Sequence, residues 1–341
     1  MLNAVYRLIA PRKFETDFND IDMKTEDVIV RPTYLSICNA DQRYFQGKRD
    51  PKVLAKKLPM ALIHEGIGKV VRDPKGEFAE GQQVVMIPNT PFEDDDIIAE
   101  NYLRSSKFRA SGFDGFMQDY VVMRRDRLVV LPEGIDPLVA AFTEIASVSY
   151  HAVTRFQNIA HSRRNAIAVW GDGNLAYITS LFIKYRMPDT KLYIFGIDRD
   201  KMSNFTFADG TYHVNEIPED MAFDHAFECV GNMASGTAIN QIIDYIHPEG
   251  TISILGVSED PVPINTRMVL EKGLRIFGSS RSGRKDFQET VDFYKNNPEV
   301  VNLLEYLVGE VIDVREVEDF TRAFEADIAK AGGKTIMIWN K

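Results

Sequence analysis

Cysteine is scarce in this 341-residue chain, which contains only Cys38 and Cys229. Two cysteines are too few for a disulfide framework, so the sequence indicates a reducing compartment and predicts a cytoplasmic protein. No run approaches the roughly 20 apolar residues that a membrane-spanning helix needs, and the first residues lack a signal-peptide cleavage pattern. The net charge of −10 is opposite in sign to the basic surface that nucleic acids and anionic membranes require. These absences predict a soluble protein that binds neither nucleic acid nor membrane.

The chain is long enough for two domains, and its sequence pattern changes near residue 137. Before that point, short β-type segments separated by turns predict a β-rich barrel. A charged stretch over 93–112 predicts a surface loop with a short helix. The predicted strands of this first region are 27–31, 67–72 and 83–87, with two more β-rich segments within 119–131.

After residue 137, apolar strand segments alternate with helical segments, which predicts an α/β region with a parallel, doubly wound sheet. A final strand over 334–339 is expected to rejoin the first domain, so that the α/β region is inserted and a cleft separates the two. The expected domains are therefore 1–148 with 285–341, and 149–284. The predicted strands of the second region are 166–171, 191–195, 223–229, 251–256 and 274–278.

A glycine loop of the order G-x-G-x-x-A connects a predicted strand to a predicted helix over 174–186. Gly171 permits a tight turn, and Gly173 lets the backbone approach a pyrophosphate. Ala176 is small enough for the helix to pack closely on the strand. The helix N-terminus, beginning at Asn174, offers free amides to phosphates. This context predicts a dinucleotide-binding site, with an unliganded strand–helix turn as the alternative.

The next strand, KLYIF, ends at Gly196, where NAD-binding proteins carry an acid. Glycine leaves room for a 2′-phosphate, and Arg199 and Lys201 are near enough in sequence to neutralise it. Asp198 could instead supply the missing acid, and the two cations could instead be a solvated helix start. On balance this strand end favours NADP over NAD.

Three residues of the first region are of the types that bind catalytic zinc in proteins: Cys38, His64 and Glu65. Zinc suits a hydride-transfer enzyme because it stabilises the charge that develops on a carbonyl or alcohol oxygen. Glu144, at the entry to the second region, could close the cleft side of such a site. Each residue alone also fits an ordinary structural role, so only the combination favours a metal.

These motifs, taken in order, resemble the zinc-dependent, medium-chain alcohol and polyol dehydrogenase superfamily. The resemblance rests on C-x-x-D at 38–41, H-E-x-x-G at 64–68, G-x-x-V at 81–84, Glu144, and G-x-G-x-x-A at 171–176. It covers essentially the whole chain and implies a GroES-like β-rich catalytic domain with a Rossmann domain. It also implies a catalytic zinc at Cys38 and His64, with Glu65 and Glu144 as carboxylate ligands or exchange partners.

The chain departs from that superfamily in two places. The loop over 89–112 lacks the four cysteines with which many relatives bind a structural zinc, so one catalytic zinc and no structural zinc are expected. Many relatives carry a Ser or Thr two residues after the ligand cysteine, where this chain has Ala40. The usual proton relay is therefore in doubt, and a water or another group would deliver the proton.

Longer phrases, among them LPMALIHEG, WGDGNLAY and FDHAFECVG, are similar to the ribulose-5-phosphate reductases, also called ribitol-5-phosphate dehydrogenases. That resemblance implies reduction of D-ribulose 5-phosphate by NADPH to D-ribitol 5-phosphate, for CDP-ribitol and wall teichoic acid synthesis. Superfamily resemblance also implies a homodimer or homotetramer, for which the apolar strand 251–256 could pair across a two-fold axis if it lay at the sheet edge. A complex with the pathway cytidylyltransferase is a further possibility.

A sugar phosphate requires a cationic clamp. A basic cluster lies just beyond Cys38 and supplies candidates for it, although solvated charges paired with Asp41 and Asp50 are the alternative. Ser279, with Arg281 close by, lies on a turn that could contact the cofactor or a phosphate. The candidate phosphate ligands are Arg43, Lys48, Arg49 and Arg109.

Three other functions fit parts of this pattern. An NAD-linked dehydrogenase of a free polyol would leave the basic cluster without a role. A zinc-free quinone reductase, or a nucleotide sensor without catalysis, would leave Cys38, His64 and Glu65 unexplained. The residues thus favour the zinc enzyme of a phosphorylated ketose.

Overall fold

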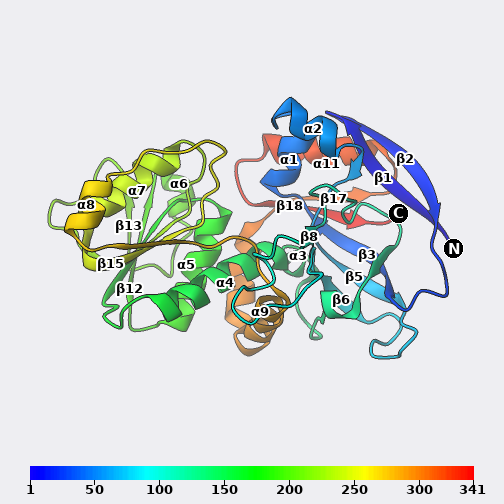
Figure 1. Cartoon of the computed structure of the whole chain (residues 1–341), viewed down its shortest axis with the longest axis horizontal. Coiled ribbons are helices and arrows are strands. Elements are labelled where there is room, and N and C mark those ends of the chain that lie inside the picture. Colours follow the sequence, from blue (N-terminus) through cyan, green and yellow to red (C-terminus); the bar gives the residue numbers. More distant parts are fainter. The chain divides into compact units, whose positions relative to one another are not determined.

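The computed structural model describes residues 1–341 and divides into two compact units (Figure 1). Unit 1 comprises Met1–Ser147 and Ser282–Lys341, and unit 2 comprises Val148–Arg281. None of the helices combines the length and hydropathy that crossing a membrane requires.

The main sheet of unit 1 has the strand order β10-β6-β5-β3-β18-β17, and β9 also pairs with β3. Its central strands are rich in Val and Ile, whose branched side chains suit a pleated surface buried on one side. Strand β18 runs antiparallel to β3, so the C-terminal segment completes this sheet. The strands are β3 (Val28–Ser36), β5 (Glu65–Arg72), β6 (Gln83–Met86), β9 (Val121–Met123), β10 (Leu128–Val130), β17 (Val308–Val314) and β18 (Lys334–Trp339).

A second sheet of unit 1, in the order β2-β1-β4, was not predicted from the sequence. It consists of β1 (Leu2–Ala10), β2 (Lys13–Asp20) and β4 (Met60–Ala61). Strand β2 is polar and largely exposed, which suits an edge strand but gives little hydrophobic periodicity to detect. Between the sheets lies an apolar core that includes Phe45, Phe116, Phe320 and Trp339.

The helices of unit 1 lie around these sheets. They are α1 (Asn39–Phe45), α2 (Pro51–Lys57), α3 (Pro137–Ala140), α9 (Arg284–Asn296), α10 (Pro298–Leu304) and α11 (Glu318–Ala329), with short 3₁₀ turns at Arg125–Arg127 and Glu305–Leu307. Helix α4 (Thr143–Ile159) begins in unit 1 and continues into unit 2.

The short helix predicted within 93–112 is absent, and that prediction was wrong. The two-residue strands β7 (Asn89–Thr90) and β8 (Lys107–Phe108) pair with each other and enclose a loop. Within it, one carboxylate oxygen of Asp95 accepts hydrogen bonds from the amides of Ile97 and Ile98, both at 2.7 Å. This side-chain turn competes with helix formation for the same amides.

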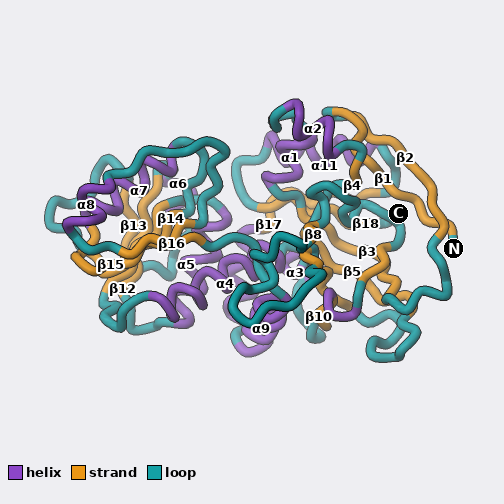
Figure 2. Tube along the Cα trace, in the orientation of Figure 1, coloured by secondary structure: helices purple, strands orange, loops and turns teal.

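Unit 2 contains one parallel sheet in the order β13-β12-β11-β14-β15-β16 (Figure 2). Helices α7 and α8 pack on one face through an apolar cluster. Ring contacts join α4 to α5 and to β14 on the other face. The predicted doubly wound α/β fold is therefore confirmed. The elements are β11 (Ala166–Trp170), α5 (Asn174–Arg186), β12 (Lys191–Gly196), α6 (Arg199–Met202), β13 (Gly210–His213), β14 (Phe223–Glu228), α7 (Ala234–Tyr245), β15 (Ile246–Ile254), α8 (Thr266–Glu271) and β16 (Arg275–Gly278).

The strand expected at 251–256 does not lie at the edge of this sheet. It belongs to β15, which pairs with β14 on one side and β16 on the other. The edges are β13 and β16, so a dimer formed by strand pairing would have to use one of those. The condition under which strand 251–256 could pair across a two-fold axis is therefore not met.

Candidate metal and cofactor site

Cys38, His64 and Glu65 come together in unit 1, and their ligand atoms all lie within 4.8 Å of one another. Sheet register explains this proximity, because Ser36 of β3 lies opposite Glu65 of β5. Cys38 follows the end of β3 and caps α1, while His64 directly precedes β5. Two neighbouring strand ends thus hold the three donors.

Asp41 connects the two segments that carry these donors. One of its carboxylate oxygens accepts a hydrogen bond from the amide of Ile63 at 3.0 Å, and the other accepts from the amide of Cys38 at 3.2 Å. The second oxygen also lies 3.5 Å from Nδ1 of His64. A carboxylate on one ring nitrogen orients the imidazole and leaves the other nitrogen for a metal.

Glu65 is held by a buried lysine from the opposite end of the chain. Nζ of Lys334, the first residue of β18, lies 2.9 Å from each carboxylate oxygen of Glu65. Both side chains are buried, and the neighbouring carboxylate raises the pKa of Lys334 although burial alone would lower it. Lys334 was not predicted, since nothing in the sequence ties a residue in β18 to the H-E motif.

Charge coupling extends to His64 and Glu144. Burial alone would lower the pKa of His64, but Asp41 and Cys38 together raise it well above its usual value. Burial raises the pKa of Glu144 to about 7, with His64 acting against this shift and Glu65 adding to it. Glu144 is buried at the start of α4 but lies outside the group of three donors.

The donor set fits a catalytic zinc ion. A thiolate sulfur, an imidazole nitrogen and a carboxylate oxygen are all common zinc ligands, and three protein ligands leave one position for a substrate oxygen. His64 and Glu65 are buried, whereas Cys38 is partly accessible. Metal binding would also need each donor deprotonated, which couples binding to pH.

The glycine loop has the conformation that the motif requires. Gly171 has a φ of 131°, and a Cβ there would come within 3.2 Å of the Ala176 Cβ. Gly173 is the N-cap of α5, and a Cβ at this position would meet no atom within 4 Å. Close packing thus leaves no room for a side chain at Gly171. Gly173 faces open space, where a pyrophosphate can approach the backbone.

Both cations expected to neutralise a 2′-phosphate are engaged with acids. The Arg199 guanidinium lies 2.6 and 2.7 Å from the two carboxylate oxygens of Glu216. Nζ of Lys201 lies 3.4 Å from Asp198, which caps α6 through two backbone amides. Asp198 is therefore already occupied as a helix cap.

Asp172, between the two glycines of the motif, was not predicted to have a role. One of its carboxylate oxygens accepts hydrogen bonds from the amides of Ile197 (2.8 Å) and Asp198 (2.9 Å). A Cβ at Gly196 would approach that same oxygen to 2.8 Å, so glycine is needed there for the carboxylate to fit. The sequence feature that could have revealed this role is the aspartate between the two glycines of the motif.

Ser279 follows β16 and is buried, with a hydroxyl that has no hydrogen-bond partner. Its amide donates to the carbonyl of Ile254 at 3.0 Å. A buried unsatisfied hydroxyl at the carboxyl end of a parallel strand is consistent with a cofactor contact, because dinucleotides bind at that edge.

The four candidate phosphate ligands have different surroundings. Arg109 is fixed internally: its guanidinium donates to the carbonyls of Asp114 (3.2 Å) and Val122 (2.8 Å), and burial lowers its pKa to about 10. Lys48 is exposed. Arg49 lies with its guanidinium carbon 4.9 Å from the ring centroid of Tyr44 on α1, and Arg43 lies on the same helix.

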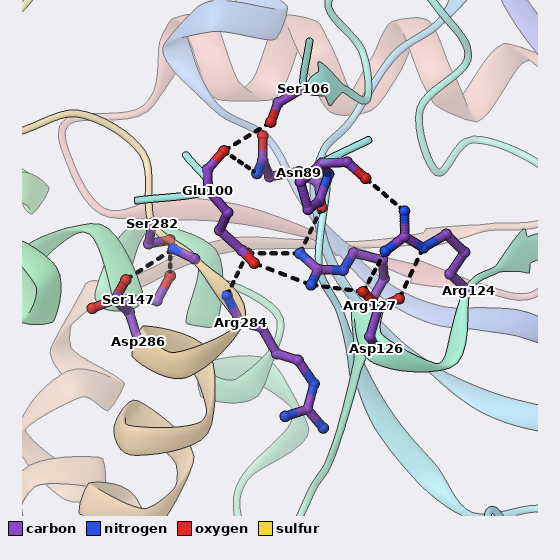
Figure 3. Close-up of polar contacts among 12 residues, drawn as sticks. Asn89, Glu100, Ser106, Arg124, Asp126, Arg127, Ser147, Ser282, Arg284 and Asp286 are labelled. Atoms are coloured by element: carbon purple, nitrogen blue, oxygen red, sulfur yellow. Dashed lines mark hydrogen bonds and ion pairs between the residues drawn. The ribbon is translucent and has the colours of Figure 1, made fainter. Parts of the chain in front are cut away.

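The loop without cysteines is cross-linked by Glu100 (Figure 3). Its carboxylate accepts from the guanidinium of Arg127 at 2.7 and 3.2 Å and from the amide of Arg284 at 2.7 Å. Its carbonyl accepts from Asn89 and Ser106. One residue thus ties the loop to the strand region on one side and to the start of α9 on the other.

Two family models match this chain. The GroES-like domain of alcohol dehydrogenases matches residues 24–133, and a zinc-binding dehydrogenase domain matches residues 201–296. The chain belongs to the medium-chain, zinc-binding dehydrogenases, which confirms the resemblance inferred from the motifs.

Relatives within this family are similar over the whole chain. The ribulose-5-phosphate reductase of Bacillus spizizenii is 56% identical over 339 residues, covering 99% of both chains. Ribulose-5-phosphate reductase 1 of Staphylococcus aureus is 54% identical over the same length and coverage. The crystal structure of S. aureus TarJ in complex with NADPH superimposes with a TM-score of 0.91 at 49% identity, covering 100% of both chains.

Proposed function

We propose that this enzyme reduces D-ribulose 5-phosphate to D-ribitol 5-phosphate, using NADPH and a single catalytic zinc ion. The observation that carries the proposal is the full-length identity of 56% to a ribulose-5-phosphate reductase. The cluster of Cys38, His64 and Glu65 supports the same reaction class. The balanced reaction consumes the ketose, NADPH and a proton, and it yields the alcohol and NADP⁺.

Cys38, His64 and Glu65 would hold the zinc, which supplies Lewis-acid polarisation of the ketone oxygen when it is bound. Cys38 would bind the metal as a thiolate, because only that form is a metal ligand. Asp41 fixes the orientation of His64, and Lys334 holds the carboxylate of Glu65 in position. Glu144 is the second carboxylate that would exchange at the site.

The pyrophosphate of NADPH would lie against Gly171, Gly173, Asn174 and Ala176, where the amides at the start of α5 favour an anion. NADPH supplies the hydride that adds to C2 of the ketose. Ser279 would donate to the cofactor through its unpartnered hydroxyl, and Arg199 and Lys201 would rearrange toward the 2′-phosphate. Ala40 has no hydroxyl, so water or another hydroxyl chain delivers the proton to the oxygen.

The biological setting is proposed on the same grounds. The product would serve CDP-ribitol and wall teichoic acid synthesis in the cytoplasm, with a cytidylyltransferase as the partner in the following step. A homodimer or homotetramer is the expected assembly. Residues 1–148 with 285–341 would form the catalytic domain, and 149–284 the nucleotide-binding domain.

The proposal is tested by incubating the purified protein with NADPH and D-ribulose 5-phosphate and identifying the product by mass spectrometry and NMR. Ribitol 5-phosphate formed in a one-to-one ratio with NADP⁺, and lost after chelation until zinc is restored, is the expected result. Absence of turnover by a zinc-loaded, folded protein would contradict it.

A further inference from the structure

Lys57, the last residue of α2, is a partly buried cation without a counter-ion. Its Nζ donates a hydrogen bond to the hydroxyl of Ser111 at 3.0 Å and forms no ion pair with any carboxylate. An ammonium group has three N–H donors, so two remain for a ligand. Buried charges in proteins are ordinarily paired, so a partly buried cation with no carboxylate partner is a candidate to bind an anionic ligand.

Two separate contacts connect Lys57 to the metal donors. Nζ of Lys57 lies 5.9 Å from the ring centroid of Tyr44, which is buried on α1, the helix that begins directly after Cys38. Six residues of helix correspond to a rise of about 9 Å. Lys57 thus lies near the far end of the helix that starts at the metal site.

The second contact runs through the loop of β8. The ring of Phe108 lies 5.3 Å from the ring of His64, centroid to centroid. The amide of Ser111 donates to the carbonyl of Phe108 at 3.2 Å, closing a turn that presents the serine hydroxyl to Lys57. Lys57 is therefore linked to His64 through the loop of Ser111 and Phe108. It is linked to Cys38 through Tyr44 and α1.

Arg49 adds a second cation beside the same aromatic ring. Its guanidinium carbon lies 4.9 Å from the ring centroid of Tyr44, compared with 5.9 Å for Nζ of Lys57. An arginine and a lysine with a neighbouring hydroxyl provide the donors that a phosphate monoester dianion prefers. Both cations thus contact the ring of Tyr44, on the helix that begins directly after Cys38.

We infer that Lys57, together with Arg49 and the hydroxyl of Ser111, binds the phosphate group of the sugar-phosphate substrate. This inference rests on the proposed function and assigns the end of the substrate that is remote from the reacting carbonyl. A five-carbon ketose phosphate carries its carbonyl near one end and its phosphate at the other. The metal donors would thus bind the carbonyl end of the substrate, and Lys57, Arg49 and Ser111 would bind its phosphate end.

The assignment also revises the basic cluster proposed from the sequence. Two guanidinium nitrogens of Arg109 donate to backbone carbonyls, and its Nε is buried without a partner. These contacts hold the guanidinium against the backbone, so Arg109 is not included among the inferred phosphate ligands. Lys57 was overlooked because it lies eight residues beyond Arg49 in sequence, at the end of a separate helix. Only the fold of α2 back onto Tyr44 brings it to the site.

The test compares Lys57→Gln with Lys56→Gln, which removes a charge from the exposed neighbouring residue. Loss of one charge-assisted hydrogen bond corresponds to about a tenfold to hundredfold effect. We expect kcat/KM for D-ribulose 5-phosphate to fall by that factor in Lys57→Gln and to stay unchanged in Lys56→Gln. The kcat/KM for unphosphorylated D-ribulose, the zinc content and NADPH affinity should be unaffected, and Lys57→Arg should restore most of the loss.

Equal losses for both substrates in Lys57→Gln, or no loss for either, would overturn the inference while leaving the reductase function intact. A wild-type enzyme that fails to reduce D-ribulose 5-phosphate would instead overturn the proposed function. Amine acetylation followed by peptide mass spectrometry provides a measurement without mutation. Ribulose 5-phosphate should protect Lys57 and leave Lys56 reactive, and equal reactivity of Lys57 with and without it would contradict the inference.

Discussion

Lys334 and Glu65 form a buried ion pair in which Nζ lies 2.9 Å from each carboxylate oxygen, and 269 residues separate them in sequence. The lysine belongs to β18 and the glutamate to β5, and both strands pair with β3. The carboxylate proposed as a zinc ligand is therefore held by a lysine of the C-terminal strand. Because both side chains are buried, neither charge has water as an alternative partner.

Replacing Lys334 by Met should destabilise the zinc-free protein strongly. Removing one partner of a buried pair leaves an uncompensated charge, which costs about 3–5 kcal/mol. Zinc should recover much of this loss, since the metal would neutralise Glu65 in place of the lysine. Thermal unfolding with and without zinc measures both effects. Lys69→Met, on an exposed position of β5, is the control, and a loss in Lys334→Met that zinc does not reduce would contradict the account.

Cys38→Ser should lose bound zinc and lower turnover by at least a hundredfold, since a serine hydroxyl does not replace a thiolate as a zinc ligand. Metal content by elemental analysis and the initial rate of NADPH oxidation are the two measurements. Cys229→Ser is the matched control, because that thiol is buried in unit 2. A Cys38→Ser protein with full zinc and full turnover would refute the metal assignment.

Glu216→Gln should strengthen NADPH binding about twofold to fivefold, because it weakens the exposed pair that holds Arg199. NADH has no 2′-phosphate, so its affinity should stay the same. Titrations of both cofactors by fluorescence give the two dissociation constants, with Glu219→Gln as a control for loss of an exposed negative charge. An equal change for NADPH and NADH would argue against a 2′-phosphate role for Arg199.

Glu100→Gln should loosen the loop over 91–106, because a neutral amide cannot pair with Arg127 and accept from Arg284 in the same way (Figure 3). Leaving the buried Arg127 with Asp126 as its remaining carboxylate partner should cost about 1–3 kcal/mol. Hydrogen exchange of loop amides should become faster while exchange in β11 and β12 is unchanged. Glu93→Gln, in the same loop and paired with Ser105, is the control.

Local signals in the sequence were sufficient for part of the fold and site. The G-x-G-x-x-A loop lies between a strand and a helix, and α5 covers the predicted residues 174–186. Cys38, His64 and Glu65 were identified because residue type and order suffice to suggest a metal site. Such features depend on a few neighbouring residues and are therefore visible without a structure.

Features that depend on long-range pairing were missed. Lys334 reaches Glu65 only through β18, and Lys57 reaches Tyr44 only when α2 folds back. The sequence leaves open whether strand 251–256 lies at the sheet edge, because nothing in its own residues reveals that β16 pairs outside it. The sequence makes Arg109 a candidate phosphate ligand, whereas tertiary contacts direct its guanidinium to backbone carbonyls.

The most direct test of the central claim is the ratio of kcat/KM for D-ribulose 5-phosphate to that for D-ribulose, measured with NADPH on the zinc-loaded wild-type enzyme. A phosphate group bound by two cations should give a ratio of at least about a hundred. A ratio near one, or a preference for D-ribulose, would contradict the assignment as a ribulose-5-phosphate reductase. It would indicate instead that the substrate is an unphosphorylated polyol or ketose.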